Sequence, residues 1–357
     1  MRKLALLSML LLAPLAVAAS VAFSAEPRRL SGVSGTVYAV ERLDNSTNTL
    51  AAFDAATGSV LGVAVVGSRP IGVLSPNGSD KVYSADERSN QLSVVSKSDL
   101  ADDGTATAKR IPMGSFPHHM TVSPNGRWLY VAEYGSHKIG VVDTRLDLRV
   151  DGFYASGNPA ARTHAVWITN DGKELYATNE GATTASFGTL SKLDASSGRR
   201  LWEVPVGLRP SEVLVTNDGK TAYVTIRNEN SVRVLDVSGE RPSRIAEVAI
   251  GTQPDTMRLT PDGKTLVVGL RGTPQLALMN TDTHAVRQVT FQGYGISGHE
   301  WLSENGKYTF IALESLTTDR PGAIGVVDND TAQVVETWTY PRGPWPHGVF
   351  YEPRVLR

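Results

Sequence analysis

Hydrophobic and polar residues alternate in short stretches along most of the chain, and one pattern of stretches recurs at intervals of roughly 45 residues. An apolar stretch leads into a turn that ends in Asn-Gly or Asp-Gly. A second alternating stretch with a tyrosine follows, then a polar loop, a third stretch ending in Asp, and a fourth stretch before the next repeat. Four antiparallel strands per repeat make one β-propeller blade, so the pattern predicts an all-β propeller.

The turn after each apolar stretch is the most regular part of the repeat. Asn-Gly and Asp-Gly between alternating stretches predict tight hairpins, because such turns need positive φ. The turn sequences are SPNG at 75–78 and 123–126, TNDG at 169–172 and 216–219, TPDG at 260–263 and SENG at 303–306.

The two ends of the repeat region complete one another. Residues 35–67 supply the second, third and fourth strands of a blade without a first, and residues 346–351 supply a first strand and then the pattern stops. We therefore expect the C-terminal strand to join the N-terminal blade and close the ring without exposed edges. First strands then begin near residues 71, 118, 164, 211, 255, 299 and 347, which gives seven blades.

The repeat resembles that of YVTN β-propeller proteins, many of which bacteria and archaea export. LYVAEYGSHKIGVVDT at 129–144 and AYVTIRNENSVRVLDV at 222–237 carry the resemblance, which spans essentially all of the chain after residue 34. It implies a seven-bladed propeller of the superfamily that includes haem-d nitrite reductase domains and lactonases. It leaves function open, because relatives also include the methylamine dehydrogenase large subunit and adhesive surface proteins.

The N-terminus has the features of an export signal. Arg2 and Lys3 precede an apolar core that runs to about Ala19, followed by small residues near Ser24. We expect a signal peptide at 1–24, an N-terminal extension at 25–34 and the propeller at 35–357, with a periplasmic or secreted location. No later apolar segment approaches the roughly 20 residues of a membrane span, which predicts no span after cleavage.

Charge and cysteine content narrow the function classes. The net charge is −1 and no basic run interleaves with aromatics, so binding to nucleic acid is disfavoured. The absence of cysteine excludes disulfides, thiolate metal ligands, cysteine nucleophiles and covalent c-type haem.

Superposing the repeats places a ring of residues where each first strand begins, at one mouth of the central channel. Four of the chain's seven histidines fall on these seven positions. For one histidine, a hydrogen bond to a neighbouring carbonyl or a preferred strand entry is an adequate explanation. Four converging on one axis favour a site. The ring is Ile71, His118, His164, Ser211, Asp255, His299 and His347.

Imidazoles at such a mouth suit either metal binding or proton transfer. As metal ligands, His118, His164, His299 and His347, with Asp255, fit copper, iron or zinc, or the iron of a non-covalent haem. The same four histidines are candidate catalytic acids and bases. His118 and His164 form one neighbouring pair, and His299 and His347 a second, which predicts that the pairs bracket a small-molecule ligand or planar cofactor.

The loops after the second strands should reach the same mouth. Arg227 and Arg271 beside Asp255 are candidates to bind a carboxylate or other anion, and Tyr134 is a candidate stacking wall. Further rim candidates are Arg42, Glu87, Glu133, Glu180 and Glu314, with Tyr294 and Trp345.

Strand alternation predicts roles for the residues beside the ring. It points His119 away from His118, into its blade. Glu300 is expected either to orient His299 or to be buried in the blade, and Trp301 to be buried. His137 is expected in solvent and His284 in an outer turn.

Three functions remain open from the sequence. The first is a metal- or metallocofactor-binding exported protein, including an oxidoreductase. The second is a lactonase-like hydrolase or lyase that uses the histidines as acid and base. The third is a noncatalytic propeller that binds a protein partner or adheres at the channel mouth. The oligomeric state is left open.

Overall fold

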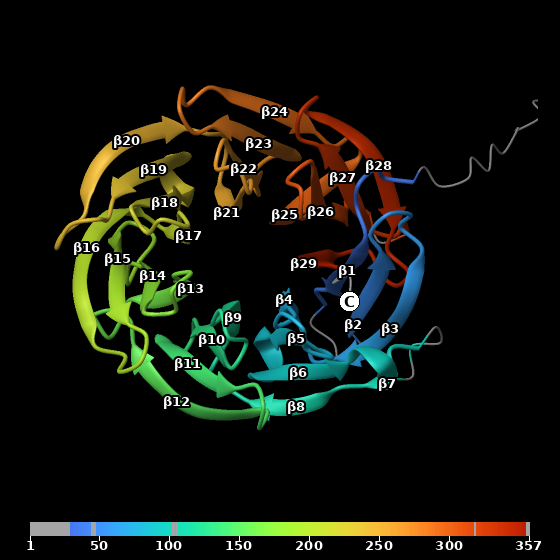
Figure 1. Cartoon of the computed structure of the whole chain (residues 1–357), viewed down its shortest axis with the longest axis horizontal. Coiled ribbons are helices and arrows are strands. Elements are labelled where there is room, and N and C mark those ends of the chain that lie inside the picture. The colour runs from blue at the N-terminus through green and yellow to red at the C-terminus, as the bar shows by residue number, and fades with distance from the viewer. Residues whose placement is uncertain (1–28, 44–47, 102–103, 105, 318, 355–357) are drawn as a thin grey trace, which may run out of the picture.

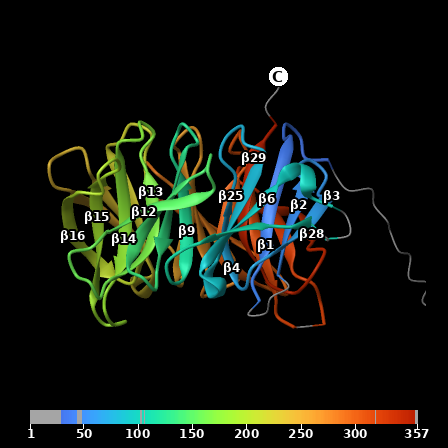
Figure 2. The same ribbon diagram turned by 90° about the horizontal axis from the view of Figure 1, so that it is seen from below.

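A computed structural model describes residues 29–354 except 44–47, 102–103, 105 and 318. Seven β-sheets surround a central channel (Figure 1). We call the strand of each sheet that lies nearest the axis its inner strand. Seen edge-on, the strands run from one face of the disc to the other (Figure 2). The fold is therefore the expected seven-bladed, four-stranded propeller. The predicted signal peptide lies outside the described residues.

The blades follow one another around the ring, and the strands of each blade are ordered from the inner strand outward. Blade 1 comprises β29 (Pro346–Pro353), β1 (Gly35–Glu41), β2 (Asn48–Asp54) and β3 (Val60–Val66); blade 2, β4 (Pro70–Leu74), β5 (Lys81–Asp86), β6 (Gln91–Ser96) and β8 (Lys109–Pro112); blade 3, β9 (Pro117–Val122), β10 (Trp128–Glu133), β11 (Lys138–Asp143) and β12 (Leu148–Tyr154); blade 4, β13 (Arg162–Ile168), β14 (Glu174–Glu180), β15 (Phe187–Asp194) and β16 (Arg200–Leu208).

The remaining blades have the same order. Blade 5 comprises β17 (Pro210–Val215), β18 (Thr221–Ile226), β19 (Ser231–Asp236) and β20 (Ser243–Ala249); blade 6, β21 (Pro254–Leu259), β22 (Thr265–Leu270), β23 (Gln275–Asn280) and β24 (Val286–Thr290); blade 7, β25 (Tyr294–Leu302), β26 (Tyr308–Ser315), β27 (Ala323–Asp328) and β28 (Gln333–Thr339). Short 3-10 turns occupy η1 (Glu87–Ser89), η2 (Lys97–Asp99) and η3 (Arg227–Glu229), and β7 (Ala106–Thr107) adds a parallel fifth strand to blade 1 beside β3.

The hairpin turn of each repeat forms as its sequence predicts. The turn glycines have φ near +70°, for example Gly219 at +71° and Gly306 at +70°, which residues with a Cβ rarely adopt. In the five turns from residue 123 onward, the first turn residue also donates a side-chain hydrogen bond to the third, as Thr169 Oγ1 does to Asp171 Oδ1 at 2.7 Å. These turns define the turn end of the channel, and the opposite end, where the inner strands begin, is the histidine end.

Packing between neighbouring blades forms the core. Alternating strand residues on both faces of each sheet are buried, and the apolar clusters join residues of adjacent blades. Tyr176 of β14, for example, is fully buried in a cluster with Val213 and Val224 of blade 5. This continuous packing around the axis fixes where each inner strand faces the channel.

The two ends of the propeller meet in blade 1, as the sequence predicts. β29 pairs antiparallel with β1, with Val37 opposite Tyr351 and Ala39 opposite Val349 (Figure 1). Val349 and Tyr351 are 4% and 3% exposed. The C-terminal strand therefore closes the ring through both hydrogen bonds and apolar packing.

A β-bulge interrupts every inner strand near the histidine end. In blade 3, Pro117 lies opposite Glu133 and Met120 opposite Val131. Between these two pairs β9 advances by three residues and β10 by two. The other six inner strands carry comparable irregularities at the equivalent place. Because a bulge adds a residue outside the ladder and redirects side chains, strict alternation fails here.

Within the described residues, no helix has the length and apolar character needed to cross a membrane.

Candidate functional site

The four ring histidines lie at the bulges, where inner strands from four blades approach the axis. His118 is on β9, His164 on β13, His299 on β25 and His347 on β29. His118 is half-buried, whereas the exposed fractions of the other three are 3%, 7% and 1%. The structure therefore brings together all four histidines that superposition of the repeats singled out.

His119 corrects the sequence prediction, which pointed it away from His118. Its ring stacks on that of His118, with centroids 4.8 Å apart and planes 18° apart. The reason is the bulge in β9, which turns both consecutive residues toward the channel. Sequence alternation alone misses this residue.

Five histidines form one continuous set of ring contacts, the histidine cluster (His118, His119, His164, His299 and His347). His119 lies at its centre, with its ring centroid 5.2 Å from that of His164 and 5.1 Å from that of His299. The His118–His164 and His299–His347 centroid distances are 4.6 and 4.3 Å.

This arrangement also corrects the expected gap between the two histidine pairs. The His119 ring contacts both His164 and His299, so it fills the space in which a ligand or planar cofactor was expected to be bracketed. A planar group at this site would lie over the cluster, on the side of the half-buried His118.

Burial keeps the ring histidines neutral. It lowers the pKa of His118, His164, His299 and His347 well below the ordinary value of 6.5, and neighbouring cationic or imidazole groups lower it further. His164 shows one defined tautomer. Since the Arg227 guanidinium can only donate, at 3.3 Å to Nε2, the His164 Nδ1–H donates to the Ser211 carbonyl at 2.8 Å.

Several imidazole nitrogens in the cluster are buried without a hydrogen-bond partner. They are His118 Nδ1, His119 Nε2 and both ring nitrogens of His347. Buried polar atoms are normally satisfied, and an unsatisfied one costs about 1–3 kcal/mol. Unpartnered nitrogens in adjoining imidazoles are available to bind a ligand. One ligand atom from each of His118, His119 and His164 lies within 4.8 Å of the others.

A buried ion pair borders the cluster on blades 5 and 6. Asp255 accepts hydrogen bonds from the guanidinium of Arg227 and from the hydroxyl of Ser211. Burial would raise the pKa of Asp255, but the charges of Arg227 and Arg271 outweigh it and hold that pKa well below its ordinary value. Asp255 is thus a charged partner of Arg227 and is held by that arginine and Ser211.

The predicted rim residues divide between the mouth and the blades. Tyr134 lies over the cluster, 6.0 Å from His118 and 5.9 Å from His164 between ring centroids, and donates to Glu180 at 2.9 Å. Arg271 is one-third exposed, with Nη1 3.7 Å from Asp255.

Several other predicted rim and histidine positions make their contacts outside the cluster. Glu133 is fully buried and accepts a hydrogen bond from Arg149 of its own blade at 2.8 Å. Its prediction as a rim residue was therefore wrong. Glu87 forms an ion pair with Arg69, and Arg320 stacks over Tyr294. His137 and His284 are outside the cluster, in loops with positive φ.

Below the histidine cluster, toward the turn end, lies a second charged layer that the sequence interpretation missed. His119 Nδ1 is 3.8 Å from Glu212 Oε1, and the same oxygen accepts from Arg258 Nη1 at 2.9 Å. Burial would raise the pKa of Glu212, but Arg258 and His119 lower it below its ordinary value. The sequence signal for this layer is the residue directly after a ring residue, which gives His119, Glu212 and Glu300. Arg258 lies three positions after Asp255.

Glu300 belongs to this layer and is buried, one of the two expected outcomes. It accepts from the Thr256 hydroxyl at 2.7 Å, and burial raises its pKa well above the ordinary range. Trp301, expected to be buried in its blade, is half-buried and lines a cavity at the turn end of the channel.

Comparisons with known proteins agree with the fold. A family model described as a lactonase seven-bladed β-propeller matches residues 49–184 and 176–290. No curated protein matches the chain.

Three solved structures illustrate the similarity. Kuenenia stuttgartiensis hydrazine synthase is 22% identical with a TM-score of 0.66, over 84% of this chain and 96% of that chain. The Pseudomonas aeruginosa periplasmic gluconolactonase is 19% identical with a TM-score of 0.67, over 90% and 99%. The dihydro-heme d1 dehydrogenase NirN, in complex with DHE, is 17% identical with a TM-score of 0.62, over 91% and 76%. At these identities the structures share a fold only, whereas the family match covers more than half of the sequence. The chain belongs to the lactonase seven-bladed β-propeller family.

Proposed function

We propose that this protein binds a transition-metal ion at the histidine end of its channel, through His118, His119 and His164. The observation that carries the proposal is the convergence of three imidazoles whose ligand atoms lie within 4.8 Å of one another. Copper, zinc and iron are the metals that neutral imidazoles suit best.

The chemistry of the donors supports this assignment. A metal needs neutral imidazole, and burial keeps His118 and His164 in that form. The Nδ1–H of His164 donates to a backbone carbonyl, and such a bond commonly orients metal-binding histidines. Nε2 is then the ligand atom, and a metal would replace its long contact with Arg227 Nη2 at 3.3 Å. Asp255 is engaged by Arg227 and Ser211, so we assign it to supporting the site rather than to ligation.

If a metal were held by these three imidazoles alone, its site would resemble catalytic sites with three protein ligands, in which substrate or water is the fourth ligand. A bound metal there supplies Lewis-acid chemistry, or electron transfer if it is copper or iron. His299 and His347 continue the cluster beyond His119, and as neutral imidazoles they can accept hydrogen bonds from a bound ligand. A metal-containing planar cofactor such as haem would use the same imidazoles from above the cluster.

A second candidate is lactone hydrolysis without a metal, and one contact favours it. Arg227 Nη2 lies 3.3 Å from His164 Nε2, which places a cation where an anionic or carbonyl oxygen would be stabilised. Family membership supports a lactone as the substrate class. In this function His118 is the general base and Arg271, at the mouth, binds an anionic group of the substrate.

We also propose that the chain is exported, as the sequence at 1–24 predicts. The similarity in fold to a periplasmic gluconolactonase is compatible with that location.

The test of the metal proposal is a binding titration of untagged protein with Zn²⁺, Cu²⁺ and Co²⁺, together with elemental analysis of the protein as isolated. We expect about one equivalent of metal, and a loss of affinity of more than about tenfold, or 1.4 kcal/mol, in His119→Ala and in His164→Ala. His284→Asn is the matched control, because Asn tolerates the positive φ of that outer turn.

The outcomes separate the two candidates. Stoichiometric binding that is lost in the cluster variants and kept in His284→Asn supports the metal site. Failure of all three ions to bind above the level of the His119→Ala variant rejects it. Hydrolysis of a gluconolactone by metal-free protein, abolished by His118→Ala, would establish the second candidate instead.

A further inference from the structure

The turn end of the channel contains a cavity that no part of the proposed function uses. Its volume is about 420 Å³, and residues from all seven inner strands line it. It opens among the hairpin turns, on the side of the charged layer away from the histidine cluster. Drug-sized ligand sites usually start near 300 Å³, so the cavity can hold a small molecule.

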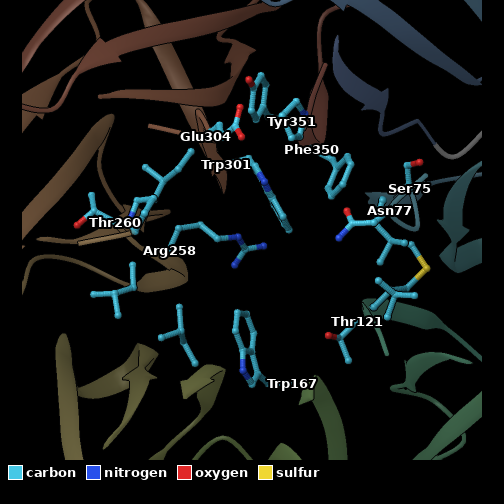
Figure 3. Close-up of a pocket in the computed structure, with 18 of the residues that line it drawn as sticks. Ser75, Asn77, Thr121, Trp167, Arg258, Thr260, Trp301, Glu304, Phe350 and Tyr351 are labelled. Atoms are coloured by element: carbon cyan, nitrogen blue, oxygen red, sulfur yellow. The ribbon is translucent and has the colours of Figure 1, made fainter. Parts of the chain in front are cut away.

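Two tryptophans and one arginine project into this cavity. Figure 3 shows Trp301 and Trp167 on opposite sides, with the guanidinium of Arg258 between them. Both tryptophans are half-buried, so each leaves part of its indole accessible. The remaining wall is mostly apolar and includes Leu74, Met120, Val122, Leu214, Leu259 and Phe350.

The packing around Arg258 makes it a rigid, directed group. Its guanidinium lies 4.2 Å from the Trp301 ring centroid, and Trp301 packs in turn on Phe350 with ring centroids 4.6 Å apart. Nη1 donates to Glu212 Oε1 at 2.9 Å and to the Met257 carbonyl at 2.6 Å. The position of the guanidinium is therefore fixed before any ligand arrives.

Arg258 keeps guanidinium donors that make no hydrogen bond among the described residues. Nη1 makes both bonds given above, Nε is buried without a partner, and Nη2 has none. An oxygen acceptor in the cavity can accept from an N–H of this guanidinium. Because Glu212 already neutralises the charge of Arg258, the acceptor can be either a carbonyl or a carboxylate oxygen.

We propose that the turn-end cavity is a second ligand site, specific for a flat aromatic molecule that carries an acceptor oxygen. The aromatic body packs on the free indole face of Trp167 and against the apolar wall, and its oxygen accepts from the Arg258 guanidinium, which already covers Trp301. A cationic group in place of the oxygen binds more weakly, because it offers the Arg258 donors no acceptor. This site shares no ligand-binding residue with the metal site, although Glu212, which contacts both His119 and Arg258, lies between the two.

The test is calorimetric titration of the full chain with 2-naphthoate, 2-naphthamide, 2-naphthylmethylammonium and cyclohexanecarboxylate. We expect one site for the naphthoate or the naphthamide, and the tighter of the two identifies the oxygen. The ammonium compound and the non-aromatic acid should bind at least about tenfold more weakly, a difference of 1.4 kcal/mol.

The variants separate the cavity from the rest of the protein. Trp167→Ala should weaken binding at least about tenfold. Arg258→Lys, which keeps a charge for Glu212 but loses the planar donor edge, should weaken it as well. Trp128→Ala is the matched control, because Trp128 lies under Arg127, away from this cavity. His119→Ala tests whether a change at the metal site alters binding in the cavity. No binding of either oxygen-bearing naphthalene overturns the proposal. So does equal binding of the ammonium compound, or binding that Trp167→Ala leaves unchanged.

Discussion

Arg227 of blade 5 and Asp255 of blade 6 form a buried ion pair across a blade boundary, directly beside the histidine cluster. Their side chains are 8% and 2% exposed, and Ser211 also donates to the same carboxylate oxygen. The pair places a fixed dipole at the channel wall and ties two neighbouring inner strands to the loop η3.

Breaking this pair should strongly destabilise the protein. Removing Asp255 alone leaves the buried Arg227 charge uncompensated, so we expect Asp255→Ala to lower the free energy of unfolding by about 3–5 kcal/mol in urea titrations. Replacing both partners, in Arg227→Met/Asp255→Leu, should cost less than the single change. The exposed Lys173–Asp171 pair provides the control, because Lys173→Ala should cost less than about 1 kcal/mol. Equal losses for Asp255→Ala and Lys173→Ala would contradict the assignment.

Glu41 gives the protein a pH-dependent stability of unusual sign. It is 2% exposed, and burial raises its pKa from 4.5 to about 7, partly offset by a hydrogen bond from Thr49. A raised carboxyl pKa means that the folded state binds the proton more tightly. Proton binding by Glu41 therefore stabilises the folded state fully below pH 4.5. This contribution to the free energy of unfolding, about 3 kcal/mol in all, is lost as the pH rises through 7.

The neutral isostere tests this effect. In urea titrations at pH 5 and pH 8, Glu41→Gln should lack the loss that the wild type shows over the same range, so the variant gains relative to wild type at the higher pH. A difference between the two proteins that does not change with pH would mean that Glu41 is ionised throughout.

The hairpin turns allow backbone strain to be separated from steric overlap. A Cβ at Gly219 would meet no atom within 4 Å. Gly219→Ala should therefore lower the free energy of unfolding only by the strain of a left-handed alanine, about 1–2 kcal/mol. At Gly306 the φ is nearly the same, but a Cβ would lie 2.6 Å from Pro261 Cδ. Gly306→Ala should therefore be the more destabilising of the two in thermal and urea unfolding. The reverse order would contradict the turn geometry.

Closure of the ring by β29 should be essential for folding. Each large apolar side chain buried on folding contributes about 1.5–3 kcal/mol, so losing Val349, Phe350 and Tyr351 removes an amount comparable with the 5–15 kcal/mol stability of a typical domain. We expect a chain ending at residue 345 to lose cooperative unfolding by circular dichroism. A chain ending at residue 354, which keeps all of β29, is the control. Cooperative unfolding of the shorter chain would show that blade 1 is stable with three strands.

The sequence was sufficient to predict the blades and the ring because both follow from local periodicity. The turn glycines set the repeat, and counting back from them located His118 and His164 at the channel. His119 was mispredicted because a bulge is a property of the pairing between β9 and β10, which alternation along one strand does not contain. It was the position of His119 that decided whether the two histidine pairs were separated or joined.

The turn-end cavity was missed for a different reason. Arg258 and Trp301 are ordinary strand residues in the sequence, and only the closed ring brings them together with Trp167 from another blade. Their burial and contacts depend on the distance across the channel, which no local pattern encodes. A search of every inner strand for large polar or aromatic residues, and not only of its first position, would have found them.

The bulges also have an evolutionary consequence. A residue that projects from a bulge lies outside the ladder, so a change at a bulge position that forms no ion pair, such as His118, alters the channel and leaves the hydrogen-bonded frame of the blade in place. Substrate preference can then drift without a compensating repair of the blades. A single architecture can in this way support chemistries as different as those named for the hydrazine synthase, gluconolactonase and dihydro-heme dehydrogenase structures that share this fold.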